Sequence, residues 1–179
     1  MTTVSVFGGT GFLGRRIVRR LTAEGAALRI AVRSADRAQS AVPAADRDRV
    51  TVFRADVRDQ ASVAAAVTGV DAVVNVVSAY VEKAGVTFES VHVQGAKTLA
   101  QKAAAAGVAR LVLVSGIGAD PASRSRYIRA RGRGEVAVKQ AFPGVTIVRP
   151  SAMFGPGDAL FATLAGIVRL LPAVPLIGG

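Results

Sequence analysis

The 179-residue sequence contains no cysteine, no tryptophan and only one histidine, His92. Without cysteine the chain can form neither a disulfide nor a thiolate metal site. A lone histidine without an HExxH pattern also argues against a zinc site, so we expect no metal. Aromatic residues make up 5% of the chain, whereas 51% of it is hydrophobic. The core must therefore be built from Val, Ala, Leu and Ile, which suits a buried parallel sheet.

Acidic residues are scarce in the second half of the chain. Residues 91–179 hold 11 Lys and Arg but only 3 Asp and Glu, and the whole chain has a formal net charge of +11. A basic excess is typical of proteins that bind nucleic acid, an anionic membrane or an anionic cofactor. Nucleic-acid binding would need a reading helix or a platform of stacking aromatic side chains, and we find neither pattern. We therefore expect no nucleic-acid partner and interpret most arginines as a solvated surface.

The sequence also lacks a signal-peptide pattern at its N-terminus. Residues 159–177 are apolar, but Arg169, Pro172 and Pro175 argue against a membrane-spanning helix. An amphipathic or buried helix fits this stretch better. We expect a cytoplasmic protein with no transmembrane span.

The strongest motif is a glycine-rich turn between an apolar strand over Val4–Phe7 and an amphipathic helix. Its glycines are Gly8, Gly11 and Gly14. Gly8 permits a tight turn with positive φ, Gly11 lets a pyrophosphate approach the backbone, and Gly14 lets the helix pack closely on the strand. The N-terminus of the helix offers free N–H groups to an anion. The spacing predicts the phosphate end of a dinucleotide site, rather than a tight turn without a ligand. The predicted contacts are Gly8, Thr10, Gly11, Phe12, Leu13 and Gly14.

Strands and helices alternate along the rest of the chain, and several of the helices end at glycine. The expected strands cover 4–7, 28–32, 50–55, 70–77, 110–115 and 145–148, and the expected helices cover 12–24, 59–67, 88–106 and 130–141. This alternation predicts an α/β fold, a Rossmann-type doubly wound parallel sheet with helices on both faces. We expect residues 1–157 to form an NAD(P)-binding domain and residues 158–179 to form an apolar helix and tail.

Ligands of a doubly wound sheet bind outside the carboxyl ends of its strands, where several polar residues of this chain fall. Arg33, with Arg37 close behind, stands where an NAD-binding protein carries an acid for the ribose 2′-OH. Because an arginine can fork onto a phosphate, this favours NADP(H) over NAD(H); the alternative is a surface arginine. Asp56 would meet the adenine or act as a cap or turn acid.

The strand-end residues resemble the short-chain dehydrogenase/reductase superfamily, in its extended and atypical branches. The stretch from Gly8 to Gly14 is similar to the fingerprint of the nucleotide epimerase/dehydratase relatives. The resemblance implies adenine contacts after the third strand and nicotinamide-ribose contacts after the fourth. The implied cofactor contacts beyond the glycine turn are Arg33, Asp56, Val57, Asn75, Val76, Val77, Arg131 and Pro150. Members of the superfamily continue beyond Gly179, so we expect the C-terminal substrate region, which starts within 158–179, to be short or missing.

Three further segments resemble a narrower group, the nucleotide-binding accessory subunit of respiratory complex I and its bacterial relatives. They are Val91–Ala96, Val114–Asp120 and Arg149–Pro156. In that group the fold is kept and NADPH is held, but turnover is not the known role. The resemblance implies a respiratory or membrane-associated protein partner and a position peripheral to the inner membrane.

The chemistry of the superfamily needs a serine, a tyrosine and a lysine four residues after the tyrosine. Ser115 resembles the catalytic serine and Tyr127 the catalytic tyrosine, but Arg131 replaces the lysine. One helical turn puts Tyr127 and Arg131 on one face, although the fork and length of arginine differ from those of an ammonium group. Lys139 lies too far along the helix to substitute. We interpret these three residues as an impaired or repurposed catalytic set, and His92 as a structural histidine.

Three functions stay open at this point. The first is an accessory or low-activity cofactor-binding protein linked to respiratory or quinone machinery. The second is an active NADP(H)-dependent reductase, dehydrogenase or sugar-nucleotide epimerase, which would use Ser115 and Tyr127 on a small carbonyl or a sugar nucleotide. The third is an NADP-sensing, regulator-like protein.

Overall fold

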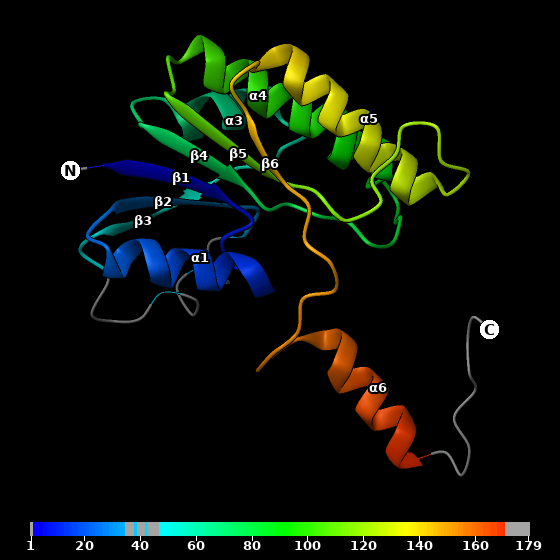
Figure 1. Ribbon diagram of the computed structural model, residues 1–179. Coiled ribbons are helices and arrows are strands. Elements are labelled where there is room, and N and C mark those ends of the chain that lie inside the picture. The colour runs from blue at the N-terminus through cyan, green and yellow to red at the C-terminus, as the bar shows by residue number, and fades with distance from the viewer. Residues whose placement is uncertain (1, 35–37, 39–41, 43–46, 171–179) are drawn as a thin grey trace.

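The computed structural model describes residues 2–34, 38, 42 and 47–170. A parallel six-stranded sheet forms its centre (Figure 1). The strands are β1 (Thr3–Phe7), β2 (Ala27–Val32), β3 (Val50–Arg54), β4 (Ala72–Asn75), β5 (Arg110–Val114) and β6 (Thr146–Val148). Their order is β3-β2-β1-β4-β5-β6, and every neighbouring pair is parallel. The order reverses between β1 and β4, and ligands of such sheets bind outside the carboxyl ends at that point.

Helices cover both faces of the sheet. The helices of the described residues are α1 (Phe12–Ala23), α3 (Gln60–Val67), η2 (Glu89–Gly95), α4 (Ala96–Ala105), α5 (Arg126–Ala141) and α6 (Ala159–Leu170). Helix α1 lies on one face, and α3, α4 and α5 lie together on the other (Figure 1). This arrangement confirms the predicted Rossmann-type fold.

The core forms two clusters, one on each face of the sheet. On the side of α3 and α4 it includes Phe7, Val63 and Leu99, and on the side of α1 it includes Val18 and Ile30. Nearly all of these side chains are aliphatic, in agreement with the composition. The packing fixes the carboxyl ends of the strands relative to one another, and the polar residues of the site lie at those ends.

Some predicted boundaries were wrong, for local reasons. Strand β4 ends at Asn75 rather than at residue 77, because the Val77 N–H turns back to the Asn75 side-chain oxygen at 3.1 Å. Helix α5 starts at Arg126, four residues before the predicted start, because the Ser125 hydroxyl caps it. The helix predicted over 88–106 is present, but its first half is the π-helix η2.

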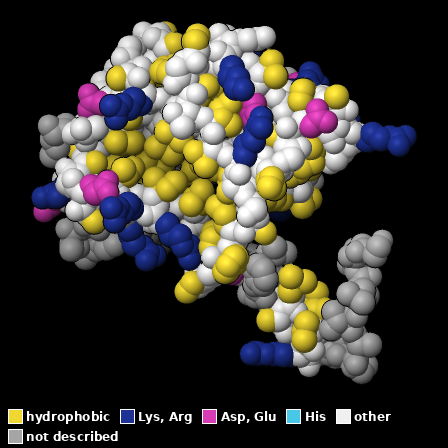
Figure 2. All heavy atoms as spheres, in the orientation of Figure 1, with side chains coloured by type: hydrophobic (Ala, Val, Ile, Leu, Met, Phe, Trp, Pro, Cys, Tyr) yellow, Lys and Arg dark blue, Asp and Glu magenta, His cyan; other side chains and the backbone are white. Residues whose placement is uncertain are grey.

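The predicted C-terminal helix is present as α6, which extends away from the sheet (Figure 1). Leu164 and Val168 are 45% and 55% exposed, so of the two alternatives, an amphipathic or a buried helix, the buried one does not hold for these side chains. Figure 2 shows hydrophobic side chains on the surface of α6 and Lys and Arg scattered over the same face of the molecule. Within the described residues no helix is long and apolar enough to cross a membrane. Arg37 and the predicted tail 171–179 lie outside the described residues.

Candidate functional site

The glycine-rich turn leads from β1 into α1 at the centre of the sheet. Gly8 has a φ of +84°, and the Gly11 N–H donates to the Gly8 carbonyl at 3.0 Å. A Cβ on Gly14 would lie 2.1 Å from the Gly8 oxygen, so no other residue fits there without a shift of the backbone. No side-chain hydrogen bond caps α1, which leaves the first N–H groups of the helix available to a ligand. The turn therefore has the shape and the donors that a pyrophosphate requires.

The loop after β6 is attached to the start of α1. Arg16 donates from Nη1 to the Phe12 carbonyl at 2.9 Å and from Nη2 to the Pro156 carbonyl at 2.8 Å. Its guanidinium lies 3.9 Å from the centre of the Phe12 ring. This arginine thus joins the last loop of the sheet domain to the helix that follows the glycine turn.

A cavity of about 300 Å³ opens beside the ends of β2 and β3. Its lining consists of Arg33, Arg54, Ala55, Asp56, Asp59 and Ser62. The position next to the glycine turn, across β2, suits the adenosine half of a dinucleotide.

Asp56 is already engaged as a turn residue. Its carboxylate accepts the backbone N–H of Arg58 at 3.0 Å and forms an ion pair with the Arg58 side chain at 2.6 Å. The hydrogen bond from the Arg58 side chain lowers the pKa of Asp56 below its ordinary value, although partial burial opposes the change. Asp59 caps α3, because its carboxylate accepts the Ala61 N–H at 3.0 Å.

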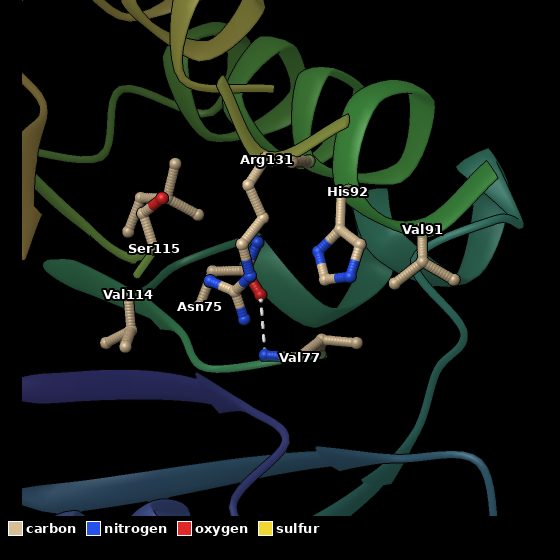
Figure 3. Close-up of a pocket in the computed structure, with 9 residues that line it drawn as sticks. Asn75, Val77, Val91, His92, Val114, Ser115 and Arg131 are labelled. Atoms are coloured by element: carbon tan, nitrogen blue, oxygen red, sulfur yellow. Dashed lines mark hydrogen bonds between the residues drawn. The ribbon is translucent and has the colours of Figure 1, made fainter. Parts of the chain in front are cut away.

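The opposite half of the candidate site lies at the ends of β4 and β5. A second cavity there measures about 10 Å³, which is room for about one water molecule. Figure 3 shows Arg131 reaching from α5 into this region between Ser115 and His92. The lining consists of Asn75, Val77, Val91, His92, Ala96, Leu113, Val114, Ser115 and Arg131. The structure therefore brings together Asn75, Ser115 and Arg131, three residues that the sequence placed in one site.

Arg131 is only 7% exposed, and its side chain is held by two hydroxyl groups. Nε donates to the Tyr127 hydroxyl at 2.7 Å, and Nη2 donates to the Ser78 hydroxyl at 2.9 Å. The Tyr127–Arg131 pair expected from the helical spacing is thus present. The bond to Ser78 links α5 to the loop after β4, the loop expected beside the nicotinamide ribose.

Tyr127 packs in a small aromatic group. The Phe88 and His92 rings meet it edge-on, with centroids 5.4 and 5.6 Å away, and the Tyr80 ring lies 5.9 Å away. Nε2 of His92 lies 3.0 Å from the Ala79 carbonyl oxygen. Burial lowers the pKa of His92, and the nearby charge of Arg131 acts in the same direction. His92 is therefore a neutral residue that holds the loop after β4, which agrees with its interpretation as a structural histidine.

An ion pair that no motif in the sequence indicated joins α5 to the end of β6. Arg149 donates from Nε to Oε1 of the buried Glu135 at 2.9 Å, and a second bond joins Nη2 to Oε2. Burial is the largest influence and raises the pKa of Glu135, but the hydrogen bond and charge of Arg149, together with Ser115 and the charge of Lys139, outweigh it, and the pKa lies below its ordinary value. The signal that could have revealed Glu135 is its spacing, since Tyr127, Arg131 and Glu135 follow one another at four-residue intervals along one helix face.

A doubly wound sheet with a glycine cradle at its switch point and polar groups along the same edge defines a dinucleotide-binding Rossmann protein. The chain belongs to the NAD(P)H-binding family, whose model matches residues 8–159. The cofactor is therefore a nicotinamide dinucleotide.

Curated relatives cover nearly the whole chain. It is 36% identical over 169 residues to the mitochondrial NADH-ubiquinone oxidoreductase 40 kDa subunit of Neurospora crassa, covering 94% of this chain and 45% of the relative. It is 34% identical over 175 residues to the ceramide reductase of Caulobacter vibrioides, covering 97% and 53%. The chain spans about half the length of these relatives. The similarity confirms the resemblance to complex I subunits.

Solved structures show the same fold. A Bacillus halodurans protein described as an NAD-dependent epimerase/dehydratase is 23% identical to this chain. Its TM-score is 0.73 over 89% of this chain and 74% of that one. The oxidoreductase ylbE of Lactococcus lactis is 22% identical, with a TM-score of 0.71 over 88% and 73%. At this identity the likeness concerns the fold alone.

Proposed function

We propose that this chain holds NADP(H), in preference to NAD(H), as an accessory or low-activity cofactor-binding domain. The observation that carries the proposal is the small space beside Ser115 and Arg131. The cavity there holds about one water molecule, while the Arg131 side chain is bonded to Tyr127 and Ser78. The pyrophosphate end is open, whereas the end where a substrate would react is filled by the side chains of the protein.

Different residues at the strand ends would bind different parts of the cofactor. The glycine turn from Gly8 to Gly14 would take the pyrophosphate, and Arg33 would take the 2′-phosphate. The adenine would lie against Asp56 and Val57. The nicotinamide side would be held by Asn75, Val76, Val77, Arg131 and Pro150. The bound nicotinamide would supply hydride chemistry, and the protein itself would supply binding and orientation.

The relatives support a place beside a larger assembly. The similar protein of Neurospora crassa is a subunit of NADH-ubiquinone oxidoreductase. By analogy we propose a respiratory or quinone-related protein partner and a position peripheral to the inner membrane. In this proposal residues 1–157 form the cofactor-binding domain and α6 begins a second region.

An active reductase is the second candidate. It is favoured by the bond from Arg131 Nε to the Tyr127 hydroxyl at 2.7 Å, which puts a cation where the lysine of the superfamily would act. The relative named a ceramide reductase supports the same candidate. The reaction would then pass a proton through the Tyr127 hydroxyl, with the Ser115 hydroxyl orienting the carbonyl of the substrate.

The test combines binding with turnover. Titration with NADPH and NADH should show tighter binding of NADPH, and NADPH should not be steadily consumed with small carbonyls, quinones or sugar nucleotides. Arg33→Ala should lower the affinity for NADPH by about tenfold and leave the affinity for NADH unchanged, since it removes one charge-assisted bond to the phosphate. Arg110→Ala is the control, because Arg110 is exposed at the opposite end of the sheet.

Steady turnover that Tyr127→Phe abolishes would replace the accessory role with the reductase. Equal affinity for NADPH and NADH would remove the cofactor preference.

A further inference from the structure

Arg54 ends β3 beside the end of β2, and no motif in the sequence singled it out. In the parallel ladder Arg54 is the partner of Val32, the residue that precedes Arg33. Neighbouring strands lie about 4.8 Å apart, so two adjacent strand ends each carry an arginine at this edge. Both side chains line the same cavity of about 300 Å³.

The charged side chains around this cavity differ in whether they already have a bonding partner within the protein. The Arg58 side chain is bonded to Asp56 and to the Gly85 carbonyl, so it is not available to a ligand. Asp56 is paired with Arg58, and Asp59 is occupied as the cap of α3. Among the described residues, neither Arg33 nor Arg54 forms a hydrogen bond or an ion pair, and both side chains are exposed.

We propose that Arg54 acts together with Arg33 to bind the 2′-phosphate of NADP(H) and is a specificity-determining residue of this site. The inference rests on the proposed preference for NADP(H) and adds Arg54 as a second cation that would contribute to that preference. A phosphate carries three acceptor oxygens, so guanidinium groups from two adjacent strands can bond to different oxygens. The ion pair with Arg58 offsets the negative charge of Asp56, which also lies within the field of Arg33, so this carboxylate repels a phosphate less.

The experiment uses ligands that carry no nicotinamide. Adenosine 2′,5′-bisphosphate and adenosine 5′-monophosphate differ by the 2′-phosphate alone, and calorimetric titration at one ionic strength gives both dissociation constants. Arg54→Gln should lower the affinity for the bisphosphate by about tenfold. This change corresponds to one charge-assisted hydrogen bond of ~1.5 kcal/mol. The affinity for the monophosphate should stay within about twofold, and Arg54→Lys should recover part of the loss. Arg110→Gln is the matched control, and thermal melting checks that each variant is folded.

The outcomes separate this inference from the proposal on which it rests. If the wild-type protein binds both ligands equally, the preference for NADP(H) fails, and the role of Arg54 fails with it. If the wild-type protein binds the bisphosphate more tightly and Arg33→Ala loses affinity for NADPH as proposed, but Arg54→Gln matches the Arg110→Gln control, only the role of Arg54 is overturned. An equal loss for both ligands in Arg54→Gln would also overturn it, because that result would mean a general effect on the adenosine cavity.

Discussion

The two ends of the candidate site are built in different ways. At the phosphate end the shape comes from the backbone, from the absence of Cβ atoms at Gly8 and Gly14, and from a helix that no side chain caps. At the nicotinamide end the shape comes from side chains that bond to one another, with Arg131 held by Tyr127 and Ser78. The first end presents free donors to a ligand, whereas the second has used most of its groups internally. Binding of the cofactor and chemistry on it can therefore be lost or gained separately.

The largest expected effect comes from adding a side chain within the glycine turn at the phosphate end of the site. Gly14→Ala puts a Cβ 2.1 Å from the Gly8 oxygen, so the turn and α1 must move apart. We expect a loss of about 3 kcal/mol in the free energy of unfolding and a loss of more than about tenfold in NADPH affinity. Chemical denaturation and nucleotide titration measure the two quantities. Gly166→Ala in α6 is the control, because its Cβ would meet nothing within 4 Å; a similar loss in that variant would contradict the explanation.

A second variant, Arg131→Lys, places a smaller side chain at the nicotinamide end of the site. Arg131→Lys restores the tyrosine and lysine spacing of the superfamily and exchanges a broad guanidinium for a smaller ammonium group. We expect the rate of NADPH oxidation with small carbonyls or quinones to rise by about tenfold or more, while NADPH affinity changes by less than about threefold. Adding Tyr127→Phe should return the rate to background. An unchanged rate in Arg131→Lys would show that something other than this arginine limits turnover.

The smallest expected effect concerns the ion pair behind the nicotinamide end. Glu135→Gln removes the carboxylate charge that pairs with Arg149 and should lower the melting temperature at pH 7 by about 3 °C. Because the pKa of Glu135 is lowered in the folded protein, its contribution is present above the unfolded pKa of about 4.5 and is lost as the pH falls through the folded pKa. The two proteins should therefore melt more nearly together in acid. Glu24→Gln, in the exposed pair with Arg20, should change little at either pH, and an equal effect there would contradict the role of burial.

Local features of the site were predictable from the sequence. The positive φ of Gly8 and the close approach of Gly14 to Gly8 depend on residues of one short motif, so spacing alone is informative. The order of elements followed from the alternation of apolar runs and helical periodicity. The pair of Tyr127 and Arg131 followed from one helical turn.

Contacts between distant segments were not predictable. The bond from Arg131 to Ser78 joins residues 53 positions apart, and the pair of Glu135 and Arg149 depends on how α5 packs beside β6. The turn role of Asp56 was one of the two predicted alternatives, but its ion pair with Arg58 was missed, because the Arg58 side chain could equally have faced solvent. Such pairs depend on tertiary packing, which a single sequence does not specify.

The position of β1 has a consequence for the order in which the site can assemble. Gly8 packs against the backbone of Val76, where a Cβ would lie 3.1 Å from the carbonyl carbon, and β1 pairs with β4 from Val4 to Phe7. The phosphate turn therefore lacks one of its walls until the ribosome has released the chain well beyond residue 76. Until then one edge of β1 is unpaired, and non-local parallel pairing of this kind is slow and exposed to aggregation. A nucleotide can stabilise the nascent protein only after this closure, so its effect on yield should appear late in synthesis rather than at the emergence of the glycine motif.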